Sequence, residues 1–133
     1  MDEDALRVLE TVVAKAGRFG HREHLELAWT YLERAPLAVA QQSMVAAIRH
    51  VAAKHGAPDK YHATLTLAWV HLVAVHRERW SAPTFEAFLA RNPQLSNRHL
   101  LDQHYSSEVL GSADTRAAWT EPDLRSLPAL VAS

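Results

Sequence analysis

The sequence contains no cysteine, only four glycines, and aromatic residues at 8% of its 133 positions. The lack of cysteine excludes disulfides, a thiolate nucleophile and cysteine-ligated zinc. No apolar run approaches the roughly 20 residues that a membrane-spanning helix needs. The chain begins with the acidic stretch MDEDALRVLE, which lacks the basic-then-apolar order of a secretory signal. We therefore expect a cytoplasmic protein with no membrane partner.

The charge of the chain is balanced, with 14 basic and 15 acidic residues and a formal net charge of −1. The basic residues are dispersed and form no patch for nucleic acid or for an anionic membrane, so neither partner is expected. A chain of this length can bury roughly two thirds of its unfolded surface, which is enough for one self-sufficient domain over residues 1–133.

Apolar residues recur at helical spacing through the first eighty positions and predict four main helices, at about 4–16, 21–35, 37–55 and 61–79. The fourth is apolar on nearly every side and should be the central helix of a bundle over about 4–80. Residues 81–133 should wrap this bundle as short helices, one of them ending near Tyr105, followed by an extended strap around Pro122 and Pro128. No segment alternates like a strand. The fold class we predict is therefore an all-α, single-domain helical bundle.

Two of these helices share the pattern L-x-L-A-W-x-x-L, at residues 25–32 and 65–72. A helical projection of the second helix places His21 and His24 on its apolar face, and Glu23 and Glu26 on its solvated face. Polar groups on inward faces must be hydrogen-bonded or must face a cavity, since an unpaired one costs roughly 1–3 kcal/mol. Two interpretations remain open: the groups satisfy one another, or they line a small-molecule pocket between helices two, three and four. The groups concerned are His21, His24, Gln41, His62 and Thr66.

Histidines three residues apart, as His21 and His24 are, can face one metal ion, and His62 could complete the set. However, the stretch HREH is not the H-E-x-x-H of zinc proteases, and the helix glutamates that a di-iron site needs are missing from the inward faces. We therefore expect a pocket without metal or other cofactor, and keep a histidine-based metal site as an alternative.

Two elements resemble a family of small stand-alone bacterial proteins: F-x-H-x-x-H-L-x-x-A-W at residues 19–29 and K-Y-H-x-T-x-T at residues 60–66. The endings YSSEVLGSADTR and EPDL are similar as well, so the resemblance extends from about residue 19 to 128. Members often carry glutamate after the K-Y-H histidine, where this chain has Ala63. The family looks related to the Pictet–Spenglerase of streptonigrin biosynthesis, which implies an enzyme of bacterial specialised metabolism that joins a tryptophan-type amine to an aldehyde.

Together, the resemblance and the expected pocket assign a role to each candidate residue. His24 and His62 would transfer protons, and His21, Gln41 and Thr66 would bind the polar parts of the substrate. Aromatic walls would come from Tyr31, Tyr61 and Trp69. The alternative is a non-catalytic protein that binds a small ligand or another helix. A homodimer is the expected assembly only on general grounds.

Overall fold

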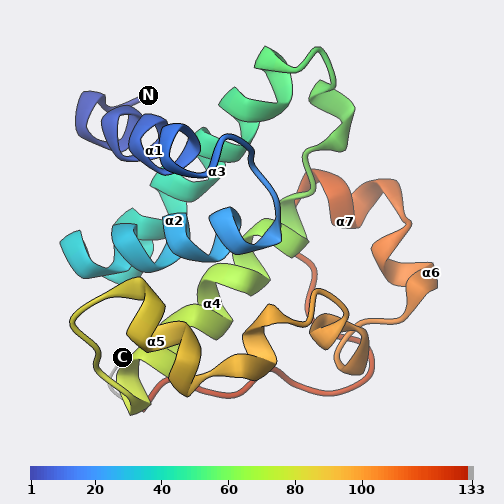
Figure 1. Ribbon diagram of the computed structural model, residues 1–133. Coiled ribbons are helices and arrows are strands. Elements are labelled where there is room, and N and C mark those ends of the chain that lie inside the picture. Colours follow the sequence, from blue (N-terminus) through green and yellow to red (C-terminus); the bar gives the residue numbers. More distant parts are fainter. Residues whose placement is uncertain (132–133) are drawn as a thin grey trace.

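The computed structural model describes residues 1–131, and this part of the chain is helical and contains no strand. Four helices form its main body: α1 (Glu3–Ala16), α2 (His21–Arg34), α3 (Leu37–Lys54) and α4 (Ala63–Arg79) (Figure 1). The predicted all-α fold is confirmed, and each of the four main helices begins and ends within two residues of its expected bounds.

Local capping explains where the main helices begin and end. The Asp2 carboxylate accepts the amide of Asp4 at 2.7 Å, which satisfies a free N–H group in the first turn of α1. Gly17 ends that helix with a φ of 72°, a left-handed conformation that glycine adopts without steric cost. Pro36 lies at the N-cap of α3, and His62 lies at the N-cap of α4.

Helix α4 is the centre of the fold, as its sequence predicts. Eleven of its 17 residues are buried, and it packs against α2, α3 and α7. Figure 1 shows it running through the middle of the molecule, below α2. Because neighbours surround it, α4 has no broad solvated face, and the polar side chains Thr64, Thr66 and His76 are buried with the apolar ones.

The 3₁₀ turn η1 (Pro58–Lys60) joins α3 to α4. After α4, the C-terminal third of the chain wraps the bundle in short pieces. They are α5 (Phe85–Arg91), η2 (Pro93–Ser96), η3 (Leu100–Gln103), α6 (Ser107–Leu110) and α7 (Ala113–Ala117). Side-chain oxygens of Thr84, Ser106 and Ser112 cap α5, α6 and α7. The single short helix expected to end near Tyr105 is wrong: two 3₁₀ turns, η2 and η3, occupy that stretch.

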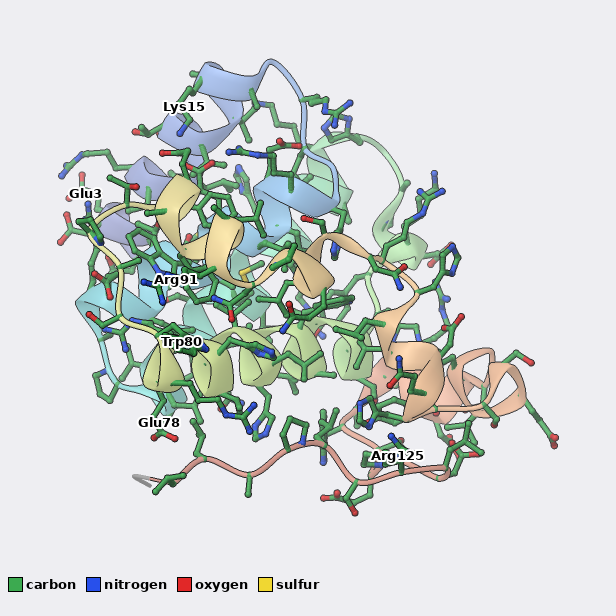
Figure 2. The ribbon with its side chains drawn as sticks, turned by 60° about the horizontal axis from the view of Figure 1, so that its bottom comes forward. Glu3, Lys15, Glu78, Trp80, Arg91 and Arg125 are labelled. Carbon is green, nitrogen blue, oxygen red and sulfur yellow. The ribbon has the colours of Figure 1, made fainter. Side chains whose placement is uncertain are left out.

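Residues 118–131 form the predicted extended strap, which runs back along α4 (Figure 2). Two histidine side chains, one from α4 and one at the C-cap of η3, form hydrogen bonds with its backbone. His71 Nε2–H donates to the carbonyl oxygen of Pro128 at 2.7 Å, and His104 bonds through Nδ1 to the carbonyl oxygen of Arg125 at 2.9 Å. Two of the nine histidines therefore serve to hold the strap.

One expectation about the faces of α2 is wrong. Glu23 and Glu26, placed on the solvated side by the helical projection, are 3% and 8% exposed. Neighbouring segments cover them because each carboxylate has a partner there: Glu23 accepts the amide of Gly20 at 2.7 Å, and Glu26 accepts Lys15 Nζ at 2.6 Å. A projection of one helix does not include these partners.

Candidate functional site

Figure 1 shows the loop that joins α1 to the start of α2. A cavity of about 640 Å³ opens beside the end of this loop. We call it the α2 cavity. Its lining combines basic and polar residues with a few apolar ones, and these residues come from the α1–α2 loop, α2, α5, the end of η2 and the loop after it. A volume of this size accommodates a small molecule. The lining residues are Arg18, Phe19, Gly20, His21, Arg22, Leu25, Leu89, Ser96 and Arg98.

The first turn of α2 leaves backbone amides unpaired at this cavity. Its N-cap residue is Gly20, which has no side chain to accept an N–H group from the turn. Glu23 bonds instead to the amide of Gly20 itself, at 2.7 Å. The amides of His21 and Arg22 therefore lie without a side-chain cap at the partially positive helix start, a position that favours anions and that the Glu23 carboxylate already adjoins.

Three arginines line the same cavity, and they differ in the ion pairs that their guanidinium groups already form. Arg22 lies 3.4 Å from both Glu26 and Glu86, and its guanidinium stacks on the ring of Phe85. Arg18 lies 3.5 Å from Glu23. Within residues 1–131 the Arg98 side chain has no hydrogen bond or ion pair, and it is exposed. Arg98 is therefore the guanidinium that is free to bind an anionic ligand.

His21 contributes the imidazole of the α2 cavity. Its Nε2 lies 2.8 Å from the carbonyl oxygen of Leu95, in η2. A carbonyl oxygen only accepts, so Nε2 carries the hydrogen and Nδ1 of the neutral ring has a free lone pair. The ring also packs edge-on against Trp69, with 4.6 Å between centroids. These two contacts fix both the tautomer and the orientation of a possible proton acceptor.

His24 lies one turn further along α2, with its ring 6.2 Å from that of Phe19. The residue as a whole is partly exposed, but its Nε2 is buried without a hydrogen-bond partner. Burial of the imidazole, with a smaller contribution from charge repulsion by His21, lowers the pKa of His24 from 6.5 to about 4. His24 is neutral near pH 7, and it is not among the residues that line the α2 cavity.

His62 uses both ring nitrogens to hold the fold together. Nδ1 accepts the amide of Leu65 at 3.1 Å and so caps α4, and Nε2–H donates to the carbonyl oxygen of Leu110 at 2.8 Å. Burial also lowers the pKa of this imidazole. Thr66 is equally occupied, because its hydroxyl donates to the carbonyl oxygen of His62 at 2.7 Å. Both nitrogens of His62 and the hydroxyl hydrogen of Thr66 are therefore already used within the fold.

The remaining candidate residues lie in other parts of the molecule. Tyr31 donates its hydroxyl to the carbonyl oxygen of Ala5 at 2.7 Å and faces α1. Gln41 borders an open groove on α3, and Tyr61 lies under the guanidinium of Arg49. Of the eight candidate residues, the structure therefore brings only His21 to the α2 cavity, with Trp69 in contact behind it.

Sequence reasoning missed the basic lining of the α2 cavity. Arg18 directly precedes the F-x-H-x-x-H element and Arg22 lies within it, so both could have been recognised from the sequence. Ser96 and Arg98 could not, because Ser96 ends and Arg98 follows a 3₁₀ turn, η2, whose place beside α2 depends on tertiary packing. Among residues 1–131 no three histidine, aspartate or glutamate side chains are grouped in a way that could hold a metal ion.

Within the described residues no helix is both long and apolar enough to cross a membrane. Comparison with protein-family models, with curated proteins and with solved structures gave no match. The resemblance to small bacterial Pictet–Spenglerase-related proteins thus remains a prediction.

Proposed function

We propose that the protein is a small-molecule enzyme that condenses a tryptophan-like amine with an aldehyde, a Pictet–Spengler-type reaction, in the α2 cavity. The observation that carries the proposal is the position of His21: an imidazole with one nitrogen anchored and the other free, on the wall of a cavity ringed by guanidinium groups. The sequence resemblance supplies the reaction class.

The reaction requires two proton-transfer stages. The amine adds to the aldehyde, and water leaves to give an imine. The indole ring then attacks the protonated imine carbon through its C2 atom, which forms the new carbon–carbon bond, and the proton on C2 must leave to restore aromaticity. We assign this last proton to Nδ1 of His21, whose other nitrogen is held by Leu95.

The anionic end of an amino-acid substrate fits the basic side of the cavity. A carboxylate there would meet the free guanidinium of Arg98 and the unpaired amides at the start of α2. This assignment replaces Gln41 and Thr66 as the groups that orient the polar end, because Gln41 borders a different groove and neither residue lines the α2 cavity.

His24 is assigned no step in the reaction. Its imidazole is neutral near pH 7 and does not line the α2 cavity, although it lies three residues after His21. We do not carry forward the catalytic role predicted for His62, because both of its nitrogens are bonded within the fold.

To test this proposal, the protein is mixed with tryptophan and a panel of aldehydes. The tetrahydro-β-carboline product is followed by chiral chromatography. We expect one stereoisomer in excess, formed faster than without protein. His21→Gln should lower kcat by about 10²–10⁴-fold. His99→Gln, which alters an exposed histidine beside Asp102, is the matched control and should retain activity.

A racemic product at the protein-free rate, for every amine and aldehyde tried, would overturn the enzymatic proposal. Saturable binding without turnover would then favour the non-catalytic alternative, a protein that binds a small anionic ligand at the same cavity.

A further inference from the structure

A second hollow lies between α1 and α3, and of its lining residues only Arg18 and Phe19 also line the α2 cavity. The two helices pack beside each other (Figure 1), and the groove between them measures about 490 Å³. We call it the α1–α3 groove. Its floor is apolar and consists of Leu9, Val13, Val51 and Phe19. No part of the proposed function uses it.

The rim of the α1–α3 groove is predominantly basic. His50, Lys54 and His55 come from the end of α3, Arg18 comes from the loop after α1, and Glu10 is the single acidic residue. In the described part of the chain the side chains of His50, Lys54 and His55 make no hydrogen bond and no ion pair. An apolar floor below the unpaired ammonium group of Lys54 is complementary to a molecule with an apolar body and an anionic head.

We propose that the α1–α3 groove is a binding site for a small amphiphilic anion, such as a medium-chain carboxylate. The volume lies in the range of small-molecule sites and is too small for a folded partner segment. From Leu9 to Gly17 the α1 side of the groove spans eight residues, or about 12 Å at the helical rise, which suits an octyl-length chain.

The anionic head must be bound by side chains and not by the backbone. Both α1 and α3 end at this side of the molecule, and the carbonyl ends of helices carry partial negative charge, which disfavours an anion. Lys54 lies in the last turn of α3 and His55 follows it. The positive charge of Lys54 must outweigh the partial negative charge of the helix ends for an anion to bind, so binding should be sensitive to the charge at residue 54.

Three probes separate the contribution of the apolar chain to binding from that of the charged head group. Octanoate has the apolar chain and the anionic head, octylamine has the chain with a cationic head, and acetate has the head without the chain. Isothermal titration calorimetry measures each affinity, and NMR shifts of the His50 and His55 ring protons report where the probe binds. We expect saturable octanoate binding with shifts at both rings, and at least tenfold weaker binding of the other two probes.

The variant Lys54→Glu should weaken octanoate binding about fivefold or more, because it reverses an exposed charge beside the head group. Lys60→Glu makes the same change at an exposed residue outside the groove and should alter the affinity less than twofold. The proposal is overturned if octanoate causes no saturable shift, if octylamine binds equally well, or if Lys54→Glu has no effect. None of these outcomes depends on whether the α2 cavity is catalytic.

Discussion

Nε2 of His21 lies 2.8 Å from the carbonyl oxygen of Leu95, and this bond joins residues that are 74 positions apart in the sequence. It connects the first turn of α2 to η2 and thereby closes one side of the α2 cavity. The same bond fixes the proton on Nε2 and leaves Nδ1 as the nitrogen that can accept a proton. A structural contact between two segments thus also sets the chemistry available at the site.

The first prediction concerns His62. His62→Ala removes the cap of α4 and leaves the carbonyl oxygen of Leu110 without its donor. We expect the free energy of unfolding, measured by urea denaturation, to fall by about 2 kcal/mol. His62→Asn should recover part of this loss, since asparagine is a good N-cap residue.

Unchanged stability in His62→Ala, together with a complete loss of turnover, would contradict this structural role. That result would return His62 to the catalytic position that the sequence first indicated.

The second prediction compares a buried glutamate of α2, Glu23, with an exposed one, Glu33. Glu23→Ala removes a buried carboxylate that holds the amide of Gly20 and lies beside Arg18, so the free energy of unfolding should fall by about 1–2 kcal/mol. Glu33→Ala breaks an exposed pair with Arg77 and should cost less than about 1 kcal/mol. Equal losses for the two variants in thermal or urea denaturation would show that the buried carboxylate has no special role.

The third prediction concerns pH. Burial lowers the pKa of His24 to about 4, so the folded protein binds fewer protons there than the unfolded chain does. Stability is therefore complete above the unfolded pKa near 6.5 and falls as the pH drops from there towards 4. The contribution of His24 to this fall is roughly 3 kcal/mol at most.

Urea denaturation between pH 7.5 and 4.5 measures this effect. His24→Leu should show a smaller loss of stability over the range than the wild type, with a remaining loss from His62, whose pKa is also lowered. An NMR titration in which His24 protonates near pH 6.5 would contradict the account.

The fourth prediction concerns Tyr31, which the sequence placed in an aromatic substrate wall. Tyr31→Phe removes the hydroxyl that donates to the carbonyl oxygen of Ala5 and should cost about 1 kcal/mol of stability. Because Tyr31 faces α1 and not the α2 cavity, turnover and ligand affinity should be unchanged. A tenfold loss of turnover at constant stability would show that the tyrosine contributes to the site.

The helices were predictable from the sequence because their signals are local. Helical spacing of apolar residues, the glycine at position 17 and the proline at position 36 act within a few residues, and the structure agrees with them. The site was less predictable, because its parts meet only after folding. Burial of Glu26 depends on Lys15 from another helix, and the basic lining depends on Arg98 from a loop after η2.

The bonding partners of the histidine side chains could not be predicted from the sequence either. A helical projection identifies a buried face but not the atom that each polar group meets there. His21, His62 and His71 each bond to a distant backbone carbonyl oxygen, at Leu95, Leu110 and Pro128. These three histidines therefore do not converge on one pocket, although two of them belong to the elements that carried the family resemblance.

The affinity of the protein for L-tryptophan, measured by isothermal titration calorimetry in wild type and two arginine variants, tests the central claim most directly. Arg98→Gln removes the free guanidinium at the α2 cavity, and Arg125→Gln removes an exposed one on the strap (Figure 2). We predict that Arg98→Gln raises Kd about tenfold, the loss expected for a charge-assisted bond to a carboxylate, and that Arg125→Gln leaves Kd unchanged. Equal affinity in the wild type and both variants would contradict the claim that the α2 cavity binds the substrate.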